Sequence, residues 1–463
     1  MKEEEEINRI SEEVLMRISP KKEEKAKLKA LTELIINKIN NKASELGIES
    51  HAISVGSTAR NTWVSGETDI DIFLMFPADI SEEELKEKGL ALAKSISDRY
   101  EERYASHPYI HAYFYDSDGK TEYEADLVPC FSVKTAALLK SDVDRTPFHN
   151  EYIIKTISGL EDEVLLLKQF LMCLGIYGSE QRRKGFSGYL CELLILKYSS
   201  LLELLRNASR WRYGERIDIE GHGKYKGEDP LIVIDPVDPK RNVAAAVSEY
   251  SFCRLIDAAR EFLTTPGMKF FLPREEKTWS KEGFVKLMKK RGTELVMVLF
   301  DAPDVVEDIL FPQLRKAEAS VTNLIERNDF RVYRSDVSVK DGKAFLVFEL
   351  LVWNLPRVKK HVGPPVTSKY HSEQFKAIYA PSHQIFIENG RYVIEVERRY
   401  TNAVSLLKNE LRSCSLGKDV SKAIEIGYEI LRNEELKFFE GLGLFLRDYF
   451  VVAKNEGDKH QDK

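Results

Sequence analysis

Cysteine is scarce in this sequence, with five residues among 463. They are scattered and no two have the C-x-x-C spacing: Cys130, Cys173, Cys191, Cys253 and Cys414. An odd number without paired spacing argues against a disulfide framework and against a zinc site built from cysteines. A reducing compartment, the cytoplasm, is the predicted location.

Long apolar runs are also missing. No stretch of about 18 apolar residues occurs, so we expect no membrane-spanning helix and no membrane partner. The first residues, MKEEEEINRI, are acidic and lack the apolar segment of a secretory signal. The sequence has no G-x-x-x-x-G-K-[ST] loop, which makes a P-loop ATPase an unlikely class.

The composition is that of a folded, multidomain chain. Hydrophobic residues make up 43% and charged residues 31%, which excludes disorder over most of the length. At about 100–200 residues per domain, the length suggests about three domains. The net charge is -6, but residues 1–150 are much more acidic than the rest. A nucleic-acid partner would therefore need local basic patches.

Hydrophobic periodicity predicts a multidomain α+β protein. We expect a mixed sheet with helices over residues 1–150, a mainly helical central domain over 151–265, an α+β C-terminal body and tail over 266–450, and a disordered end over 451–463. Within the first domain, the patterns predict a helix around Leu28–Ile39, strands at Ala52–Val55, Asp69–Phe76, Ile110–Tyr115 and Glu122–Val128, and a helix over Ser81–Arg103. The turn Asp116–Gly119 should join the last two strands.

The remaining chain shows further helix and strand signals. Helical periodicity covers Glu161–Leu174, Gly188–Arg206 and Pro312–Glu326, and strands are expected at Leu231–Ile234 and Glu294–Phe300. Two Asp-Gly and Asn-Gly pairs, in 340–343 and 388–391, are flanked by alternating apolar residues and predict hairpins.

The most informative stretch is Gly56-Ser57-Thr58-Ala59-Arg60-Asn61, followed by Asp69-Ile70-Asp71-Ile72. Alternate residues of a strand share a face, so the two aspartates project together while the isoleucines enter the core. Two neighbouring carboxylates repel each other unless a cation lies between them, and Mg²⁺ prefers oxygen ligands. Backbone N–H groups at the Gly-Ser helix start, with the Ser57 hydroxyl, suit a triphosphate.

A third carboxylate should come from a neighbouring strand. Glu122, Glu124 and Asp126 lie on one face by alternation, and Asp126 is nearest the expected strand end at Pro129. On spacing alone either glutamate is a possible substitute. Three such acids can hold two metal ions about 4 Å apart, the arrangement for in-line attack of a hydroxyl on a nucleotide α-phosphorus.

GSTARNTWVSGETDIDIFLMFP resembles the signature of the nucleotidyltransferase superfamily, and its R-N-T-W form is similar to the class I, archaeal-type CCA-adding enzymes. Four further stretches agree in order: DRTPFHNEYI, LLKQFLMCLGIYGSE, KGFSGYLCELLI and VIDPVDPKRNVAAAVS. The resemblance covers about residues 20–450 and is strongest before residue 250.

This resemblance implies an enzyme that adds C, C and A to the 3′ end of tRNA from CTP and ATP without a nucleic-acid template. Asp69 and Asp71 would bind two Mg²⁺ ions, and Asp126 would bind the ion that activates the tRNA 3′ hydroxyl. The first acid is often Glu in the family and is Asp here.

The resemblance also implies a nucleotide site. Ser57, Arg60, Lys168 and Tyr177 would contact the triphosphate. Thr146 and His149 would lie near the ribose and phosphates, and Arg241 would read the base edge together with RNA phosphates. By residue type alone, Lys168 could equally belong to an exposed helix face, Tyr177 to packing and Arg241 to a solvated turn. The stretch Ser187-Gly188-Tyr189 suggests helix capping and packing.

The acceptor stem and T arm of tRNA would need basic contacts outside the acidic centre. The candidates for these contacts are Arg182, Arg183, Lys224, Lys226, Lys289, Lys290, Arg291, Arg398 and Arg399. A homodimer is possible. Two rival functions remain: a poly(A) polymerase or another RNA-terminal transferase, and a catalytically silent RNA-binding protein. Three mutually repelling acids argue against the silent protein.

Overall fold

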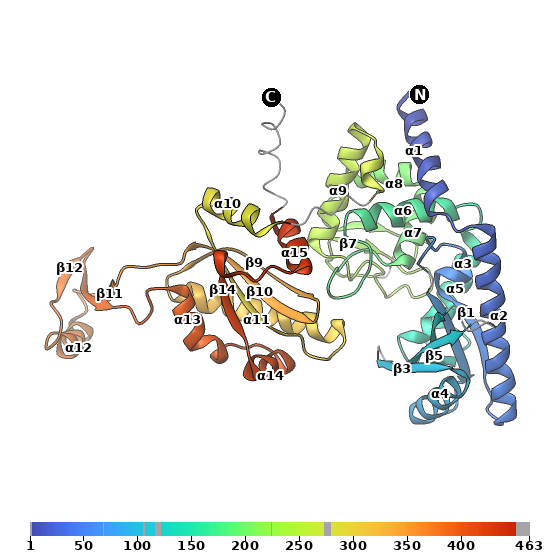
Figure 1. Cartoon of the computed structure of the whole chain (residues 1–463), viewed down its shortest axis with the longest axis horizontal. Helices are drawn as coiled ribbons and strands as arrows, with labels where there is room; N and C mark the ends of the chain where they lie inside the picture. The colour runs from blue at the N-terminus through green and yellow to red at the C-terminus, as the bar shows by residue number, and fades with distance from the viewer. Residues whose placement is uncertain are drawn as a thin grey trace. The chain divides into compact units, whose positions relative to one another are not determined.

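The computed structural model describes residues 2–67, 69–104, 107–115, 122–223, 225–272 and 279–450. The chain forms two compact units, Met1–Arg274 and Glu275–Lys463 (Figure 1). It is a multidomain α+β protein, as predicted. The predicted domain boundaries at residues 150 and 265 stay predictions, and the predicted end 451–463 and turn 116–119 lie outside the described residues. Among the helices that the structure describes, none has the length and apolarity needed to cross a membrane.

The first unit contains a five-stranded sheet in the order β1-β2-β5-β4-β3, which we call the palm sheet. Its strands are β1 (His51–Val55), β2 (Ile70–Pro77), β3 (Arg99–Tyr104), β4 (Pro108–Tyr115) and β5 (Glu122–Ser132). Strands β2 and β5 are parallel, while the other neighbours are antiparallel. The short helix α3 (Gly56–Arg60) leaves the end of β1 directly.

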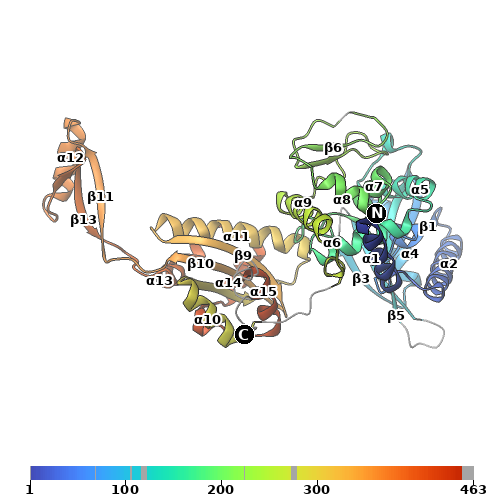
Figure 2. The same ribbon diagram turned by 90° about the horizontal axis from the view of Figure 1, so that it is seen from above.

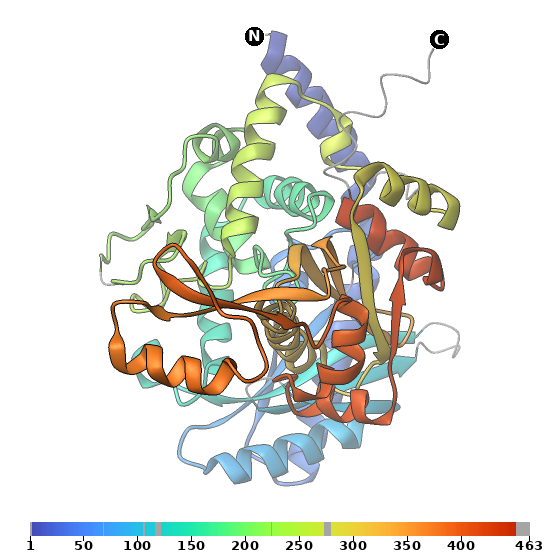
Figure 3. The same ribbon diagram turned by 90° about the vertical axis from the view of Figure 1, so that its left-hand side faces the viewer.

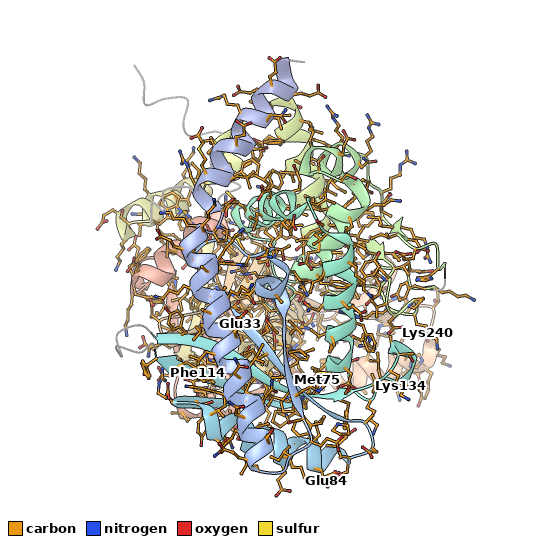
Figure 4. All side chains as sticks on the ribbon, turned by 90° about the vertical axis from the view of Figure 1, so that its right-hand side faces the viewer. Glu33, Met75, Glu84, Phe114, Lys134 and Lys240 are labelled. Atoms are coloured by element: carbon orange, nitrogen blue, oxygen red, sulfur yellow. The ribbon has the colours of Figure 1, made fainter. Side chains whose placement is uncertain are left out.

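Two helices cover one face of the palm sheet: α2 (Lys22–Glu45) and α4 (Glu82–Ile96). Their apolar residues, including Ile35, Ile39 and Leu92, share a core with Ile70 and Ile72 of β2. Figure 4 shows α2, with Glu33 labelled, running along the sheet that carries Met75 and Phe114. Because side chains alternate along a strand, Asp71 belongs to the opposite face.

The predicted helix over Ser81–Arg103 is wrong after Ile96, in its last seven residues. Ser81 caps α4 by accepting a hydrogen bond from the Glu84 N–H, but the helix ends at Ile96 and Ser97 is extended. Residues Arg99–Tyr104 form β3, the mostly exposed edge strand of the sheet. Tyrosines favour a strand here, and alternating charges suit an edge that must not pair with another chain.

Strand β5 continues beyond its predicted end at Val128 and passes through Pro129 to Ser132. Pairing with β4 ends at Leu127, so the missing N–H of Pro129 breaks no bond of that ladder. On the other side β5 stays paired with β2 as far as Ser132.

The rest of the first unit is mainly helical, as predicted. It comprises α1 (Lys2–Ile18), α5 (Thr146–Thr156), α6 (Glu161–Cys173), α7 (Gly188–Tyr198), α8 (Leu201–Ala208) and α9 (Glu249–Thr264), with the parallel pair β6 (Glu215–Ile217) and β7 (Leu231–Val233). Helix α1 buries Ile7, Ile10 and Val14 in this helical core, not in the palm core.

The predicted single helix Gly188–Arg206 is two helices. Ser199 adopts a left-handed conformation with φ 65°, which ends α7. Ser200 then caps α8 by accepting a hydrogen bond from the Glu203 N–H. A serine pair thus provides both a helix end and a new start, which apolar periodicity alone does not reveal.

The second unit has a four-stranded antiparallel sheet in the order β14-β8-β10-β9. Its elements are α10 (Lys281–Arg291), β8 (Glu294–Asp301), α11 (Glu307–Arg327), β9 (Arg331–Lys340), β10 (Lys343–Val352), α13 (Ala403–Glu410), α14 (Lys418–Ile426), β14 (Glu429–Arg432) and α15 (Glu440–Phe450). Figure 2 shows α11 beside β9 and β10. Asp341 and Gly342 have φ 51° and 70°, so the predicted hairpin is confirmed.

A smaller sheet in the order β11-β13-β12 forms the tail (Figure 3). It consists of β11 (Val358–Pro365), β12 (Phe386–Glu388) and β13 (Arg391–Glu397), with α12 (Lys369–Tyr379) packed on β11. Phe375, Tyr392 and Ile394 form its own small core. The second predicted hairpin is confirmed, with Asn389 and Gly390 both at positive φ.

Candidate active site

Asp71 and Asp126 stand side by side on the palm sheet. They are register partners of the parallel strands β2 and β5. Ile70 and Ile72, which flank Asp71 in the sequence, are 2% and 0% exposed and lie in the palm core. Asp69 immediately precedes β2 and is exposed. The predicted alternation of acids and core isoleucines is therefore confirmed.

The Gly56 backbone lies directly against the Asp71 carboxylate. A Cβ placed on Gly56 would be only 2.1 Å from Asp71 Oδ2, and Gly56 has φ +80°. Only glycine satisfies both conditions, because it has no Cβ and tolerates positive φ. The glycine of the Gly-Ser motif thus allows the start of α3 to lie against the Asp71 carboxylate.

We expect Gly56→Ala to reduce nucleotide transfer by about 10²-fold or more, because the new methyl group must displace Asp71. Gly47→Ala is the matched control: Gly47 also has positive φ but has open space around its Cβ position. Both variants carry a backbone strain of about 1 kcal/mol. Single-turnover rates report the displacement of Asp71, and melting temperatures report the backbone strain. A Gly56→Ala enzyme as active as Gly47→Ala would contradict the close contact between Gly56 and Asp71.

Burial, together with the neighbouring charges of Asp126 and Asp69, raises the pKa of Asp71 to about 7. Burial also raises the pKa of Asp126, although its hydrogen bond with His111 acts in the opposite direction. The pKa of both carboxyl groups is raised although Arg60 acts on Asp71 and Arg103 on Asp126 in the opposite direction, and a divalent cation would relieve this environment.

His111 on β4 is a neighbour that sequence reasoning missed. Its Nδ1 is 2.6 Å from Asp126 Oδ1, and its Nε2 is 3.2 Å from Glu124 Oε2. Glu124, one of the possible substitutes for Asp126, is more exposed and is not a register partner of Asp71. The register therefore favours Asp126 as the third acid.

The donor set fits Mg²⁺ in kind, because all three groups are carboxylates. Within the described residues, no group of three His, Cys, Asp or Glu side chains is already arranged to hold a metal ion. One oxygen of Asp126, Oδ1, contacts His111 Nδ1 at 2.6 Å.

Arg60, at the end of α3, is buried between the palm and the helical part of the first unit. Its Nε donates to Glu192 Oε1 at 2.9 Å, and its Nη1 donates to Asn150 Oδ1 at 3.4 Å. The Thr62 hydroxyl donates to the same Glu192 oxygen at 2.6 Å. Glu192 on α7 is fully buried. Arg60 is therefore fixed by side chains from α5 and α7.

Lys168 does not belong to an exposed helix face. It is 2% exposed, and its ammonium donates to the Thr62 carbonyl and lies 5.9 Å from the centre of the Tyr177 ring. Burial lowers the pKa of Lys168, while Glu192 opposes this effect. Gly188 at the start of α7 leaves room for both groups, since its Cβ position is 3.3 Å from Tyr177 Oη and 3.6 Å from Lys168 Nζ.

His149 and Arg241 converge on one buried carboxylate, Asp235. His149 Nε2 lies 2.8 Å and Arg241 Nη1 3.0 Å from Asp235 Oδ2. The Tyr189 hydroxyl donates to Asp235 Oδ1 at 3.2 Å. Tyr189 therefore does more than pack. Thr146 begins α5, the helix that carries His149, and Ser57 is the second residue of α3.

A cavity of about 550 Å³ opens beside the acidic centre. Its lining includes Asp69, Glu124, Tyr177 and Arg183. Arg183 donates to the Tyr177 carbonyl at 2.9 Å and pairs with Glu180 at 3.0 Å. Arg183, one of the predicted RNA contacts, thus lines the cavity beside the acidic centre.

The remaining basic candidates are scattered. In the first unit, Arg182 and Lys226 are exposed, and Lys224 lies outside the described residues. In the second unit, Lys289 and Lys290 at the end of α10 are exposed, whereas Arg291 pairs with buried Glu349 at 2.7 Å. The two neighbours Arg398 and Arg399 also differ, with side chains 15% and 77% exposed. Their RNA contacts stay predictions.

Three residues of the site were missed by sequence reasoning: His111, Glu192 and Asp235. Glu192 had a usable signal, because a single acid in the otherwise apolar GYLCELLILKY indicates a buried partner. Asp235 directly follows the buried segment Leu231–Ile234. His111 carried no signal, since only the strand order β2-β5-β4 brings it to Asp126.

Comparison with known proteins gives matches along most of the chain. Three family models match in order: "Nucleotidyltransferase domain" over 36–149, "tRNA nucleotidyltransferase, second domain" over 162–272 and "CCA-adding enzyme, C-terminal domain" over 291–433. Among solved structures, CdnC of E. coli MS115-1 with ATP matches at TM-score 0.45 and 18% identity, covering 58% of this chain and 94% of that chain. That score is too low to bear on function.

The palm sheet with its paired acids and the first two family models place this chain among the nucleotidyltransferases. The CCA-adding enzyme of Methanosarcina barkeri is 44% identical over 91% of this chain and 93% of its own length. That of Methanosarcina acetivorans is 41% identical over 91% and 93%. The chain belongs to the family of archaeal CCA-adding enzymes, as the sequence motifs predicted.

Proposed function

We propose that this protein adds C, C and A stepwise to the 3′ end of tRNA, using CTP and ATP and releasing pyrophosphate. The observation that carries the proposal is the side-by-side placement of Asp71 and Asp126 against the Gly56 helix start, in a chain similar to CCA-adding enzymes over 91% of its length. Synthesis and repair of the tRNA CCA terminus follow from this activity.

Asp69, Asp71 and Asp126 would hold two Mg²⁺ ions. When bound, the ions lower the pKa of the attacking 3′ hydroxyl and neutralise charge on the departing pyrophosphate. The raised pKa of Asp71 supports this assignment, because a bound cation favours its ionised form. The carboxylates themselves orient the reacting groups and need no histidine base.

The nucleotide would lie between the palm and the helices of the first unit. Ser57, Arg60, Lys168 and Tyr177 would hold the triphosphate, and buried positive charge at Arg60 and Lys168 would stabilise the leaving group. Thr146 and His149 would lie at the ribose and phosphates, and Arg241 at the base. The contacts of His149 and Arg241 with one carboxylate support a common site for these two residues.

The acceptor stem and T arm would contact basic residues outside the acidic centre. Cytoplasmic location agrees with free cysteines, of which Cys130 and Cys191 are buried. A homodimer remains part of the proposal, and sedimentation of the pure protein tests it directly.

The predicted RNA surface is tested by changing Arg399 alone, with its neighbour Arg398 left as it is. Arg398 pairs with Asp329, so reversing its charge would also break this ion pair and place two negative charges together. We expect Arg399→Glu to weaken tRNA binding and to lower the slope of log affinity against log salt by about 1. Affinity for CTP should not change.

Lys437→Glu is the matched control for Arg399→Glu, because Lys437 is 65% exposed and also pairs with an acid. Filter binding at several salt concentrations compares both variants with the parent protein. An Arg399→Glu protein that binds tRNA like the parent at matched salt would remove this residue from the RNA surface.

The activity itself is tested with a tRNA transcript that ends at the discriminator base. Two additions with CTP alone, one further addition when ATP is present and then a stop would support CCA addition. A long ladder from ATP alone would indicate a poly(A) polymerase. Binding of tRNA without incorporation would indicate the silent RNA-binding protein.

A further inference from the structure

We propose that Asp235 is a positioning residue for nucleotide selection: it holds His149, Tyr189 and Arg241 in one fixed frame. This inference rests on the proposed function, because it takes Arg241 as the residue at the nucleotide base. It assigns the strictness of base choice to a carboxylate that touches neither substrate nor metal.

Four hydrogen bonds converge on the Asp235 carboxylate. Oδ2 accepts from His149 Nε2 at 2.8 Å and from Arg241 Nη1 at 3.0 Å. Oδ1 accepts from the Tyr189 hydroxyl at 3.2 Å and from the Val237 N–H at 3.0 Å. Asp235 is 0% exposed, so water does not compete for these bonds.

The partners come from three separate segments of the chain. His149 lies on α5, Tyr189 on α7 and Arg241 on the turn after β7. The rings of His149 and Tyr189 stack with centroids 4.0 Å apart and an interplanar angle of 21°. Asp235 therefore ties α5, α7 and the turn together at one point.

Asp235 keeps its charge in this buried position. Burial acts to raise the pKa of Asp235, but the hydrogen bond with His149 and the charge of Arg241 lower it to about 2. A permanent carboxylate only accepts hydrogen bonds, so His149 must carry its proton on Nε2. This fixes the tautomer of the histidine and leaves its other nitrogen for further contacts.

The turn fixes the Arg241 backbone as well. The Asp235 N–H donates to the Arg241 carbonyl at 3.1 Å, and the Arg241 N–H donates to the Asp238 carbonyl at 2.9 Å. Asp238 is itself held by Arg145 Nε at 2.9 Å. Both ends of the Arg241 residue, backbone and guanidinium, are thus constrained.

The contact with Asp235 still leaves N–H donors of the Arg241 guanidinium for other partners. An arginine has five N–H donors, and the contact with Asp235 uses one of them. The Arg241 side chain is 38% exposed. An arginine that is oriented but still able to donate meets the requirement for reading base edges, which differ in their donors and acceptors.

Fixing Arg241 should affect the selection of the base more than the binding of the nucleotide. A donor in a fixed position forms a hydrogen bond with a matching base and leaves a mismatched base unpaired, whereas a mobile arginine adapts to several bases. Removing the Asp235 charge should therefore reduce discrimination more strongly than it reduces triphosphate binding.

The test is Asp235→Asn, which keeps the shape but replaces one acceptor oxygen by a donor. Specificity constants are measured for CTP against UTP at the first added position and for ATP against GTP at the last. We expect each ratio to fall by about tenfold or more in the variant. Asp229→Asn is the matched control, because Asp229 accepts from Tyr225 and Asn242 in the same region without contacting Arg241.

Several outcomes separate the inference from the proposed function. A parent enzyme that does not add CCA would refute the proposed function. A parent that adds CCA and an Asp235→Asn variant with lower rates but unchanged ratios would overturn the inference.

If Asp235→Asn fails to fold, Tyr189→Phe decides the matter, since it removes one bond to Asp235 and keeps the ring stack. Unchanged ratios in Tyr189→Phe would then overturn the inference, and a fall of about threefold would support it.

Discussion

Replacing Asp71 by Asn is expected to lower nucleotide transfer by about 10³-fold or more, while making the metal-free protein more stable above pH 7. The loss of activity follows from the position of Asp71 against Gly56 and beside Asp126, its register partner on the neighbouring strand. An amide cannot replace a carboxylate as a strong ligand for a divalent cation.

The gain in stability follows from the pKa of Asp71. In the folded protein this pKa is about 7, above the ordinary value of 3.8. A carboxyl group with a raised pKa supports folding below about pH 4 and loses this contribution as the pH rises through 7. Asn resembles the neutral acid at every pH. One pKa unit corresponds to about 1.4 kcal/mol, so the gain above pH 7 has an upper bound of about 4 kcal/mol.

Urea unfolding at pH 5 and pH 8 in a metal chelator measures the effect. The difference between parent and variant should grow with pH, and added Mg²⁺ should stabilise the parent more than the variant. Asp79→Asn, at an exposed turn after β2, is the control and should alter neither property. Turnover retained by Asp71→Asn would overturn the assignment of the acidic centre.

The central elements of the palm were predictable from the sequence. Alternation in Asp69–Ile72 identifies both the start of the strand and the face that Ile70 and Ile72 give to the palm core, because successive side chains of a strand point to opposite faces. The Asp341-Gly342 and Asn389-Gly390 turns were predictable for a local reason, since their residues tolerate positive φ.

The errors occurred where local pattern and tertiary context disagree. Arg99–Tyr104 reads as a continuation of α4, yet pairing with β4 makes it a strand. At Ser199-Ser200 the backbone leaves the helical conformation, but the spacing of the apolar residues continues almost unchanged from α7 to α8.

The pair Asp69 and Asp71 was predictable because the two residues are two positions apart at the start of β2. His111 was not, because it lies on a different strand and meets Asp126 only through antiparallel pairing. Asp235 was quoted within a motif, but its role as a shared acceptor depends on α5 and α7 meeting the turn after β7.

Replacing Arg60 by Met is expected to destabilise the protein by about 3–5 kcal/mol, because it leaves the buried Glu192 carboxylate without its charge partner. Arg60 and Glu192 are 8% and 0% exposed, so solvent cannot compensate for the loss. The double variant Arg60→Met with Glu192→Gln should recover much of this stability, since neither charge then remains buried. Urea unfolding of all four proteins in the resulting cycle measures the coupling.

Activity should not recover together with stability. Among the described residues, Glu192 Oε2 has no hydrogen-bond partner, although Oε1 accepts from both Arg60 and Thr62. A pair kept only for stability would satisfy both oxygens, because an unpartnered buried acceptor costs about 1–3 kcal/mol. We therefore expect the folded double variant to bind nucleotide poorly, with a KM for CTP raised about tenfold or more, as the triphosphate loses the fixed charge of Arg60. A double variant with restored stability and parental KM would show that Arg60 joins α3 to α7 without contacting the triphosphate.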